Sequence, residues 1–174
     1  EAESKARYYR NLCFNPKERF AHDELGYNFR MSGIQAAFGL GQLARINEII
    51  EKKIKMGKLY ESHLSGITGV KIQTEKPWAK MVYWMYCIEL SPKHNMLASE
   101  VMAELGKKNI GTRPFFRGLH DQPAIKARGF HYDAKEFPIT EQAYKYGLYL
   151  PSGLNLTNAN IDYVCMQLKS LLNK

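Results

Sequence analysis

The sequence lacks the features that mark several common classes of protein. It has only three cysteines, Cys13, Cys87 and Cys165, and they lie far apart in apolar surroundings. Because they have no zinc-ligand spacing, we expect no metal site and three reduced thiols in the core of a cytoplasmic protein. No apolar run approaches the roughly 18 residues of a membrane span, and we find no signal peptide ahead of the first expected helix. We therefore expect no membrane partner.

Motifs for several enzyme chemistries are also missing. The sequence contains neither GxxxxGK[ST] nor GxGxxG, which disfavours nucleotide hydrolysis and dinucleotide binding. His120 and Asp121 are adjacent, but no activated serine or cysteine motif accompanies them. They therefore do not indicate a catalytic triad.

Positive charge is in excess, with a formal net charge of +8. The densest group, Lys52, Lys53, Lys55 and Lys58, lies on an expected long helix, where a solvated helix face is the simpler interpretation. A basic surface also suits an anionic small substrate, such as a sugar nucleotide, or a nucleic acid. No clustered basic stripe with interleaved aromatic residues is present, which disfavours nucleic acid as a partner.

Hydrophobic periodicity predicts a mixed fold of helices and short strands. Helices are expected at about 1–12, 33–63, 98–108, 140–146 and 158–172, with one helical turn at 124–127; strands are expected at 70–73, 81–90 and 110–116. Three glycines, Gly33, Gly39 and Gly41, lie in the first half of the long helix. They indicate close approach of another backbone, within the protein or across a dimer.

The segment His22–Ala37 combines polar and aromatic residues just before a helix. Gly26 permits a tight turn. Asn28 offers an amide, and Arg30 offers a fork of donors for a carboxylate or phosphate. Ser32 is the expected N-cap of the helix that follows. This arrangement suits anion binding, although the loop's polar groups could equally satisfy only its own backbone.

A second polar and aromatic cluster lies in Ile110–Pro123, whose sequence is IGTRPFFRGLHDQP. Arginines beside phenylalanines suit a diphosphate and the face of a base or sugar. A surface loop anchored by its two phenylalanines is the alternative interpretation. The later GLYLP segment, at 147–151, is interpreted as structural.

Together these segments resemble the nucleotide-sugar aminotransferases of the DegT/StrS type, which use pyridoxal phosphate on the fold-type I scaffold. The matching segments follow the family's order along almost the whole chain: RYYRNLCFNP, HDELGYNFRMSGIQAAFGLGQL, WAKMVYWMY, IGTRPFFRGLHDQP and GLYLPSGLNLT. VYWMY and TRPFF are most similar to perosamine synthetases. Those enzymes aminate a GDP-linked 4-keto-6-deoxymannose, with glutamate as the usual amino donor.

The resemblance implies an α/β fold, the C-terminal small domain of a fold-type I pyridoxal phosphate-dependent transferase. This domain has a small, mostly antiparallel sheet, flanking helices and one long N-terminal helix. The implied segments are the tail of the large domain with the active-site loop (1–32), a long connecting helix (33–66) and the small domain (67–174). The family's Schiff-base lysine belongs to the large domain, so we expect no catalytic residue here and no activity from this chain alone. Glu1 already lies in an expected helix, which fits a fragment.

Some family roles can be carried over residue by residue. Asn28 matches the asparagine that reaches the cofactor phosphate of the neighbouring subunit in the homodimer. Arg30 matches an arginine that contacts the substrate anion or lines the active site. Arg113, Phe116 and His120 match the loop that borders the sugar-nucleotide site.

The aromatic strand and the loop after Phe116 leave alternatives open. Tyr83 and Trp84 match the family's aromatic strand, where packing and substrate contact are both consistent with the pattern. Relatives often carry a bulkier residue and a proline where this chain has Arg117 and Gly118, which puts the loop's rigidity and its sugar preference in doubt. Because a pocket's preference depends on a few contacts that these motifs discriminate poorly, a UDP- or dTDP-linked keto sugar is an alternative substrate. A non-catalytic basic domain that binds an acidic partner or nucleic acid is the alternative from another class.

Overall fold

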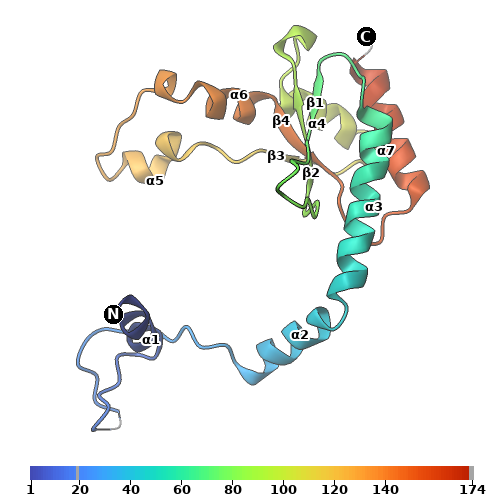
Figure 1. Cartoon of the computed structure of the whole chain (residues 1–174). Coiled ribbons are helices and arrows are strands. Elements are labelled where there is room, and N and C mark those ends of the chain that lie inside the picture. Colours follow the sequence, from blue (N-terminus) through green and yellow to red (C-terminus); the bar gives the residue numbers. More distant parts are fainter. Residues whose placement is uncertain (19, 173–174) are drawn as a thin grey trace. The chain divides into compact units, whose positions relative to one another are not determined.

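The structure, a computed structural model, describes residues 1–18 and 20–172. It divides into two compact units, Glu1–Ile46 and Asn47–Lys174. The first unit holds α1 (Ala2–Arg10) and α2 (Gly33–Leu43) (Figure 1). The second holds nearly all of α3 and every later element: α3 (Ile46–Leu64), β1 (Val70–Ile72), β2 (Tyr86–Leu90), α4 (Ala98–Gly106), β3 (Arg113–Pro114), α5 (Pro123–Lys126), α6 (Pro138–Tyr146), β4 (Gly147–Leu150) and α7 (Asn158–Leu172).

The second unit is built on a four-stranded antiparallel sheet with the order β1-β2-β4-β3. The central pair places Tyr86 opposite Leu150 and Ile88 opposite Leu148. Burial alternates along β2, where Tyr86, Ile88 and Leu90 are buried. Such alternation is typical of a strand with one face against a core.

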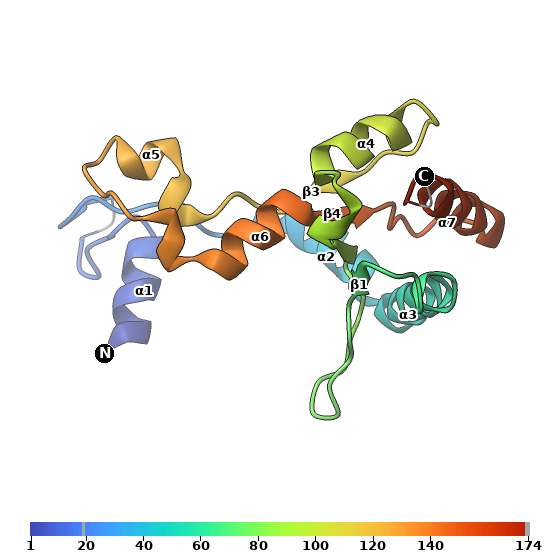
Figure 2. The ribbon, with the colours of Figure 1, turned by 90° about the horizontal axis from the view of Figure 1, so that it is seen from above.

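Helices α3, α4 and α7 supply the other side of this core. Their buried residues, including Leu64, Val101 and Leu168, join the buried face of the sheet in one cluster. Both views show α3 and α7 side by side (Figures 1 and 2). His63 Nε2 on α3 lies 2.7 Å from Asp162 Oδ1 on α7, which ties the two helices together at the surface.

Three tyrosines form the end of the core nearest the start of β2. The Tyr60 and Tyr86 rings stack with centroids 4.7 Å apart, and Tyr83 stacks on Tyr86 at 6.0 Å. Tyr83 has a left-handed backbone, with φ +47°. Its ring occupies the space beside Gly57 on α3, where a Cβ would lie 2.4 Å from the ring. Gly57 thus permits the close approach of Tyr83.

This packing corrects two expectations from the sequence. The strand expected at 81–90 begins only at Tyr86, because the left-handed Tyr83 interrupts extended backbone. A single helix was expected over 33–63, as part of a connecting helix over 33–66. The structure has two helices there, α2 and α3. Arg45 N donates to Gln42 O, three residues back, so the backbone tightens into a turn between α2 and α3. No glycine or proline marks that position.

Other elements agree with the sequence more closely. Helices α4 and α7, strand β1 and the short helix α5 lie where they were expected. The strand expected at 110–116 is shortened to β3. Helix α6 begins at Pro138, two residues before the expected cap Thr140. The GLYLP segment contains β4, a central strand. No helix in the described residues is both long and apolar enough to cross a membrane.

All three cysteines are free thiols, as expected. Cys13 and Cys165 are buried and Cys87 is partly buried. Burial raises the pKa of the Cys87 thiol to about 11 and that of Cys165 to about 12. Because the thiolate is the reactive form, both thiols are inert near neutral pH.

Gly57→Ala tests the core packing. We expect it to lower the free energy of unfolding by about 1–3 kcal/mol, because the new Cβ overlaps a buried ring. Gly106→Ala is the matched control, since a Cβ there meets nothing within 4 Å. Urea unfolding of both variants measures the difference, and equal stability of the two would contradict this account.

Candidate functional site

In the first unit, the loop at 22–30 is hydrogen-bonded to the end of α1 and the residues after it. Tyr27 N donates to Tyr9 O at 2.8 Å, and Phe29 N donates to Arg10 O at 3.2 Å. Asn15 Nδ2 donates to Asp23 Oδ1 at 2.9 Å. This ladder holds the backbone on both sides of Asn28.

Gly26 has a more specific role than a turn. A Cβ on Gly26 would lie 2.5 Å from the carbonyl carbon of Leu12 and 2.6 Å from Cys13 N. Leu12 and Cys13 have φ angles of +63° and +51°. Two successive left-handed residues other than glycine store backbone strain, which is frequent at functional sites. The close approach over Gly26 therefore fixes a strained turn beneath the candidate loop.

Ser32 is the N-cap of α2, as expected. Its hydroxyl accepts from Gln35 N at 3.3 Å, while Ser32 N donates to Gln35 Oε1 at 2.8 Å. This reciprocal capping box fixes the point where the loop becomes helix. None of the residues of α2 is buried.

Asn28 and Arg30 lie together just before this cap. Asn28 Oδ1 accepts from Arg30 N at 3.4 Å and from Arg30 Nε at 3.3 Å. Within the described residues, nothing accepts from Asn28 Nδ2 or from the terminal nitrogens of Arg30. Both side chains are exposed. The pair therefore presents amide and guanidinium donors to solvent, which is a donor set suited to an anion.

In the second unit, Trp84 is exposed by 69% and Tyr83 is buried. Lys53 Nζ on α3 donates to Trp84 O at 2.9 Å and to Ser152 O. Burial lowers the pKa of Lys53. Lys53 was assigned from the sequence to a solvated helix face, and this was wrong for Lys53, which joins α3 to the backbone at Trp84.

Ser152 completes the same junction. Its hydroxyl accepts from Tyr86 N at 2.9 Å and donates to Leu150 O at 2.8 Å. The indole of Trp84 therefore projects from a backbone held by α3 and by the residue pair after β4. Lys53 and Ser152 were not identified from the sequence, because nothing local to either residue predicts a contact across 99 positions.

Arg113, Phe115 and Phe116 lie at β3 and directly after it. Arg113 is exposed and pairs with Tyr149 in the sheet. The Phe115 ring contacts Tyr149 with centroids 4.9 Å apart, and Phe115 N donates to Gly147 O at 3.2 Å. Phe116 is exposed by 76%. Trp84 and Phe116 lie beyond opposite ends of β4, so their backbones are separated by at least about 10 Å along the strand.

His120 lies in the 3-10 helix η2 (Leu119–Asp121) and is only 6% exposed. Its Nε2 lies 2.8 Å from Glu141 Oε1 on α6. Its ring stacks on Phe137, with centroids 4.4 Å apart and planes 14° apart. Within the protein, Phe137 covers one face of the His120 ring and Glu141 pairs with its Nε2. A contact between His120 and the substrate therefore stays a prediction.

The Arg117–Gly118 departure does not leave the loop without support. Arg117 Nε donates to Asp121 Oδ2 at 2.5 Å, and Lys126 also pairs with Asp121. Both cations lower the pKa of the Asp121 carboxyl, and the hydrogen bond from Lys126 has the larger effect. Gln122 Nε2 donates to Arg117 O at 3.3 Å. The loop is thus cross-linked by ion pairs from Arg117 and Lys126 to Asp121.

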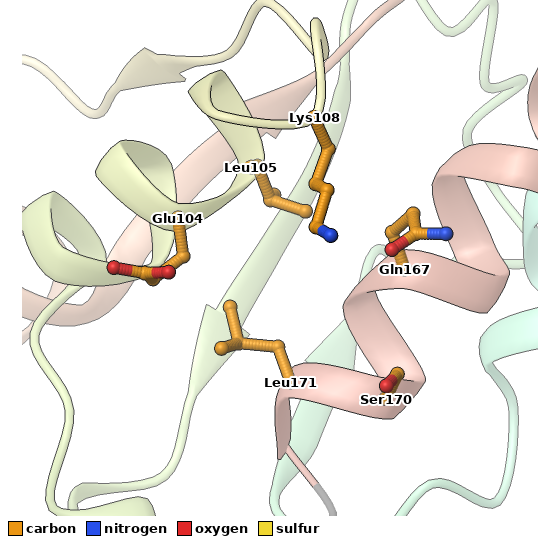
Figure 3. Close-up of a pocket in the computed structure, with 6 residues that line it drawn as sticks. All are labelled: Glu104, Leu105, Lys108, Gln167, Ser170 and Leu171. Carbon is orange, nitrogen blue, oxygen red and sulfur yellow. The ribbon is translucent and has the colours of Figure 1, made fainter.

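A hollow between α4 and α7 lies outside these residues (Figure 3). Leu105 and Leu171 form its apolar part, and the Lys108 side chain points into it. None of the predicted site residues lines it. No group of acidic, histidine and cysteine side chains in the described ranges could hold a metal ion.

Comparison with known proteins identifies the family. The profile of the DegT/DnrJ/EryC1/StrS aminotransferase family matches residues 1–169. The chain belongs to this family. The GDP-perosamine synthase of Caulobacter vibrioides is 30% identical over 173 residues, which cover 97% of this chain and 45% of that protein. The GDP-perosamine synthase of Escherichia coli O157:H7 is 30% identical over 147 residues, covering 84% of this chain and 38% of that protein. The chain thus spans less than half the length of these curated relatives.

Solved structures confirm the expected α/β fold class. DesV of S. venezuelae, solved in complex with a ketimine intermediate, is 20% identical with a TM-score of 0.84, over 99% of this chain and 44% of that one. Helicobacter pylori PseC, an aminotransferase involved in the biosynthesis of pseudoaminic acid, is 18% identical with a TM-score of 0.85, over 99% and 47%. At 18–20% identity, these structural similarities support the fold of this chain and nothing beyond the fold.

Asp121 makes the loop of this aminotransferase-family chain sensitive to acid. Because the folded-state pKa is lowered, the stabilisation is present above the ordinary value of 3.8 and is lost as the pH falls through the lowered pKa. We expect the amide NMR shifts of residues 117–126 to change in that acid range, and Asp121→Asn to remove the change. A transition centred at or above the ordinary value would contradict this assignment.

Proposed function

We propose that this chain is the C-terminal part of a pyridoxal phosphate-dependent aminotransferase. The enzyme transfers an amino group from glutamate to a nucleotide-linked 4-keto-6-deoxy sugar, and the nucleotide is GDP, as the names of the two GDP-perosamine synthases indicate. The observation that carries the proposal is the family match over residues 1–169, which includes every residue assigned to the site. The proposed segments remain 1–32, 33–66 and 67–174, except that 33–66 holds two helices, α2 and α3, of which α3 belongs almost wholly to the second compact unit.

The donors at Asn28 and Arg30 fit the phosphate of such a cofactor. The Asn28 amide oxygen is engaged by Arg30, which leaves Nδ2 directed to other partners. When bound, pyridoxal phosphate supplies an electron-withdrawing ring that stabilises negative charge on the carbon undergoing amino transfer. Asn28 would donate to the phosphate in the neighbouring subunit's site, and Arg30 would bind the substrate anion or line the site. The Schiff-base lysine lies outside these residues on this proposal, so the chain alone is inactive.

The substrate contacts come from the second unit. Arg113 offers an exposed guanidinium for the diphosphate, and Phe116 and Trp84 offer exposed rings for the base or sugar. Tyr83 is buried against Gly57, so its contribution is to hold Trp84 in place. His120 contributes through the loop that carries Phe116.

A homodimer is part of this proposal. The α2 surface exposes Ile34, Phe38, Leu40 and Leu43 although none of its residues is buried. A helix that is apolar and has no buried residue needs a partner surface. The Gly39 and Gly41 positions are open, which allows another backbone to come close.

Asn28→Ala tests the role in cofactor binding. We expect the full-length enzyme to retain pyridoxal phosphate about tenfold more weakly, because one to two charge-assisted hydrogen bonds are lost. Cofactor retention after dialysis measures the effect. Asn47→Ala, an exposed change on α3, is the control. Unchanged retention in Asn28→Ala would remove the phosphate role.

Calorimetry of this chain distinguishes the substrate class from the alternative of a basic binding domain. We expect heat of binding with a GDP-linked sugar and none with a DNA duplex. Binding to the duplex that weakens steeply with salt would instead favour a nucleic-acid partner. Titrations with UDP- and dTDP-linked sugars address the nucleotide preference.

A further inference from the structure

The buried histidine of η2 is enclosed from three sides by residues of the second unit. Phe137 covers one ring face, Glu141 Oε1 lies within hydrogen-bond distance of Nε2, and Gly118 lies beside the ring edge formed by Cε1 and Nδ1. A Cβ on Gly118 would lie 2.3 Å from His120 Cε1 and 2.6 Å from Nδ1. We call these four residues, Gly118, His120, Phe137 and Glu141, the His120 clamp.

The chemistry of the clamp fixes the state of the ring. A carboxylate accepts hydrogen bonds, so an Nε2 at 2.8 Å from Glu141 Oε1 carries its proton and donates. Among the described residues, nothing forms a hydrogen bond with Nδ1. The side chains of His120 and Glu141 are 5% and 23% exposed, so water competes little for this pair. A hydrogen bond to a charged group in such a place is stronger than one at the surface.

The clamp holds one side of Phe116, and the sheet holds the other. Phe115 contacts Tyr149 and occupies the space beside Gly147, where a Cβ would lie 2.4 Å from its ring. Two residues after Phe116, Gly118 contacts the clamped imidazole. The backbone of Phe116 is thus fixed from both sides, while its ring is mostly exposed and meets the Tyr149 ring edge-on, with centroids 6.3 Å apart. Glu141 reaches this segment from α6, more than 20 residues along the chain.

We propose that Glu141 is a positioning residue of the candidate substrate loop: it accepts the hydrogen bond of His120 Nε2 and thereby fixes the backbone that carries Phe116. The role of Glu141 in catalysis rests on the proposed function. The hydrogen bond and its effect on the loop are independent of that function. Glu141→Leu removes the acceptor, and Glu141→Gln keeps an acceptor oxygen without the charge. Glu136→Gln, an exposed carboxylate in η3 (Ala134–Glu136), is the matched control.

Two measurements on this chain test the clamp directly. Long-range NMR correlations of the His120 ring should show a protonated Nε2 in the wild type and in Glu136→Gln, and a mixture of tautomers in Glu141→Leu. Amide exchange at Asp121 and Gln122, whose N–H groups donate to Gly118 O and Leu119 O in the same loop, should be faster in Glu141→Leu by about tenfold or more, with Glu141→Gln in between. An unprotonated Nε2 in the wild type, or unchanged exchange in Glu141→Leu, would overturn the proposal.

Kinetics of the full-length enzyme separate positioning from a purely structural role. In Glu141→Leu we expect the KM for the keto sugar to rise about tenfold, because a small misplacement of a substrate contact is costly. The KM for glutamate and the cofactor content should stay unchanged, and Glu141→Gln should restore part of the loss. A lower melting temperature with an unchanged KM for the sugar would contradict positioning. If the wild type transfers no amino group, the proposed function fails, and the ring and exchange measurements still decide the clamp.

Discussion

The pairing of β2 with β4 is the constraint on which the second unit depends. Its register buries Tyr86, Ile88, Leu148 and Leu150 in one core against α3, α4 and α7. The same pairing sets where the candidate site residues emerge. Trp84 precedes β2 beside the residues that follow β4, and Phe116 lies beyond the other end of β4. A one-residue slip would reverse which side chains face the core and would move both groups.

Contacts between distant residues position the exposed side chains of the site. Lys53 and Ser152 join α3, β2 and β4 around the backbone of Trp84. The His120 clamp and the Asp121 pairs hold the loop after Phe116. In the first unit, Gly26 and the ladder to α1 do the same for Asn28 and Arg30. Each exposed donor or ring therefore projects from a backbone that is buried or cross-linked. This limits the conformational entropy that the loop loses when a ligand binds.

Local signals in the sequence predict much of the fold. Ser32 and Gln35 form a capping box that four consecutive residues specify. The apolar periodicity that predicts α4 and α7 lies entirely within the residues of each helix. Tyr83 was expected in a strand because aromatic and β-branched neighbours favour one, yet its backbone is left-handed and its ring packs in the space beside Gly57, in another element. The turn at Ala44–Arg45 carries no helix breaker. His120 was identified as a site residue from the resemblance to a family. Its burial depends on Phe137 and Glu141, and no local pattern in the sequence predicts that these two residues contact it.

The central claim is that these residues belong to an enzyme that aminates a nucleotide-linked keto sugar. The most direct measurement incubates the full-length protein with pyridoxal phosphate, ¹⁵N-labelled glutamate and a GDP-linked 4-keto-6-deoxy sugar, and analyses the sugar by mass spectrometry. The account predicts an amino sugar that carries ¹⁵N at the former keto carbon. Recovery of the keto sugar unchanged, with no ¹⁵N in this or in the UDP- and dTDP-linked analogues, would contradict it.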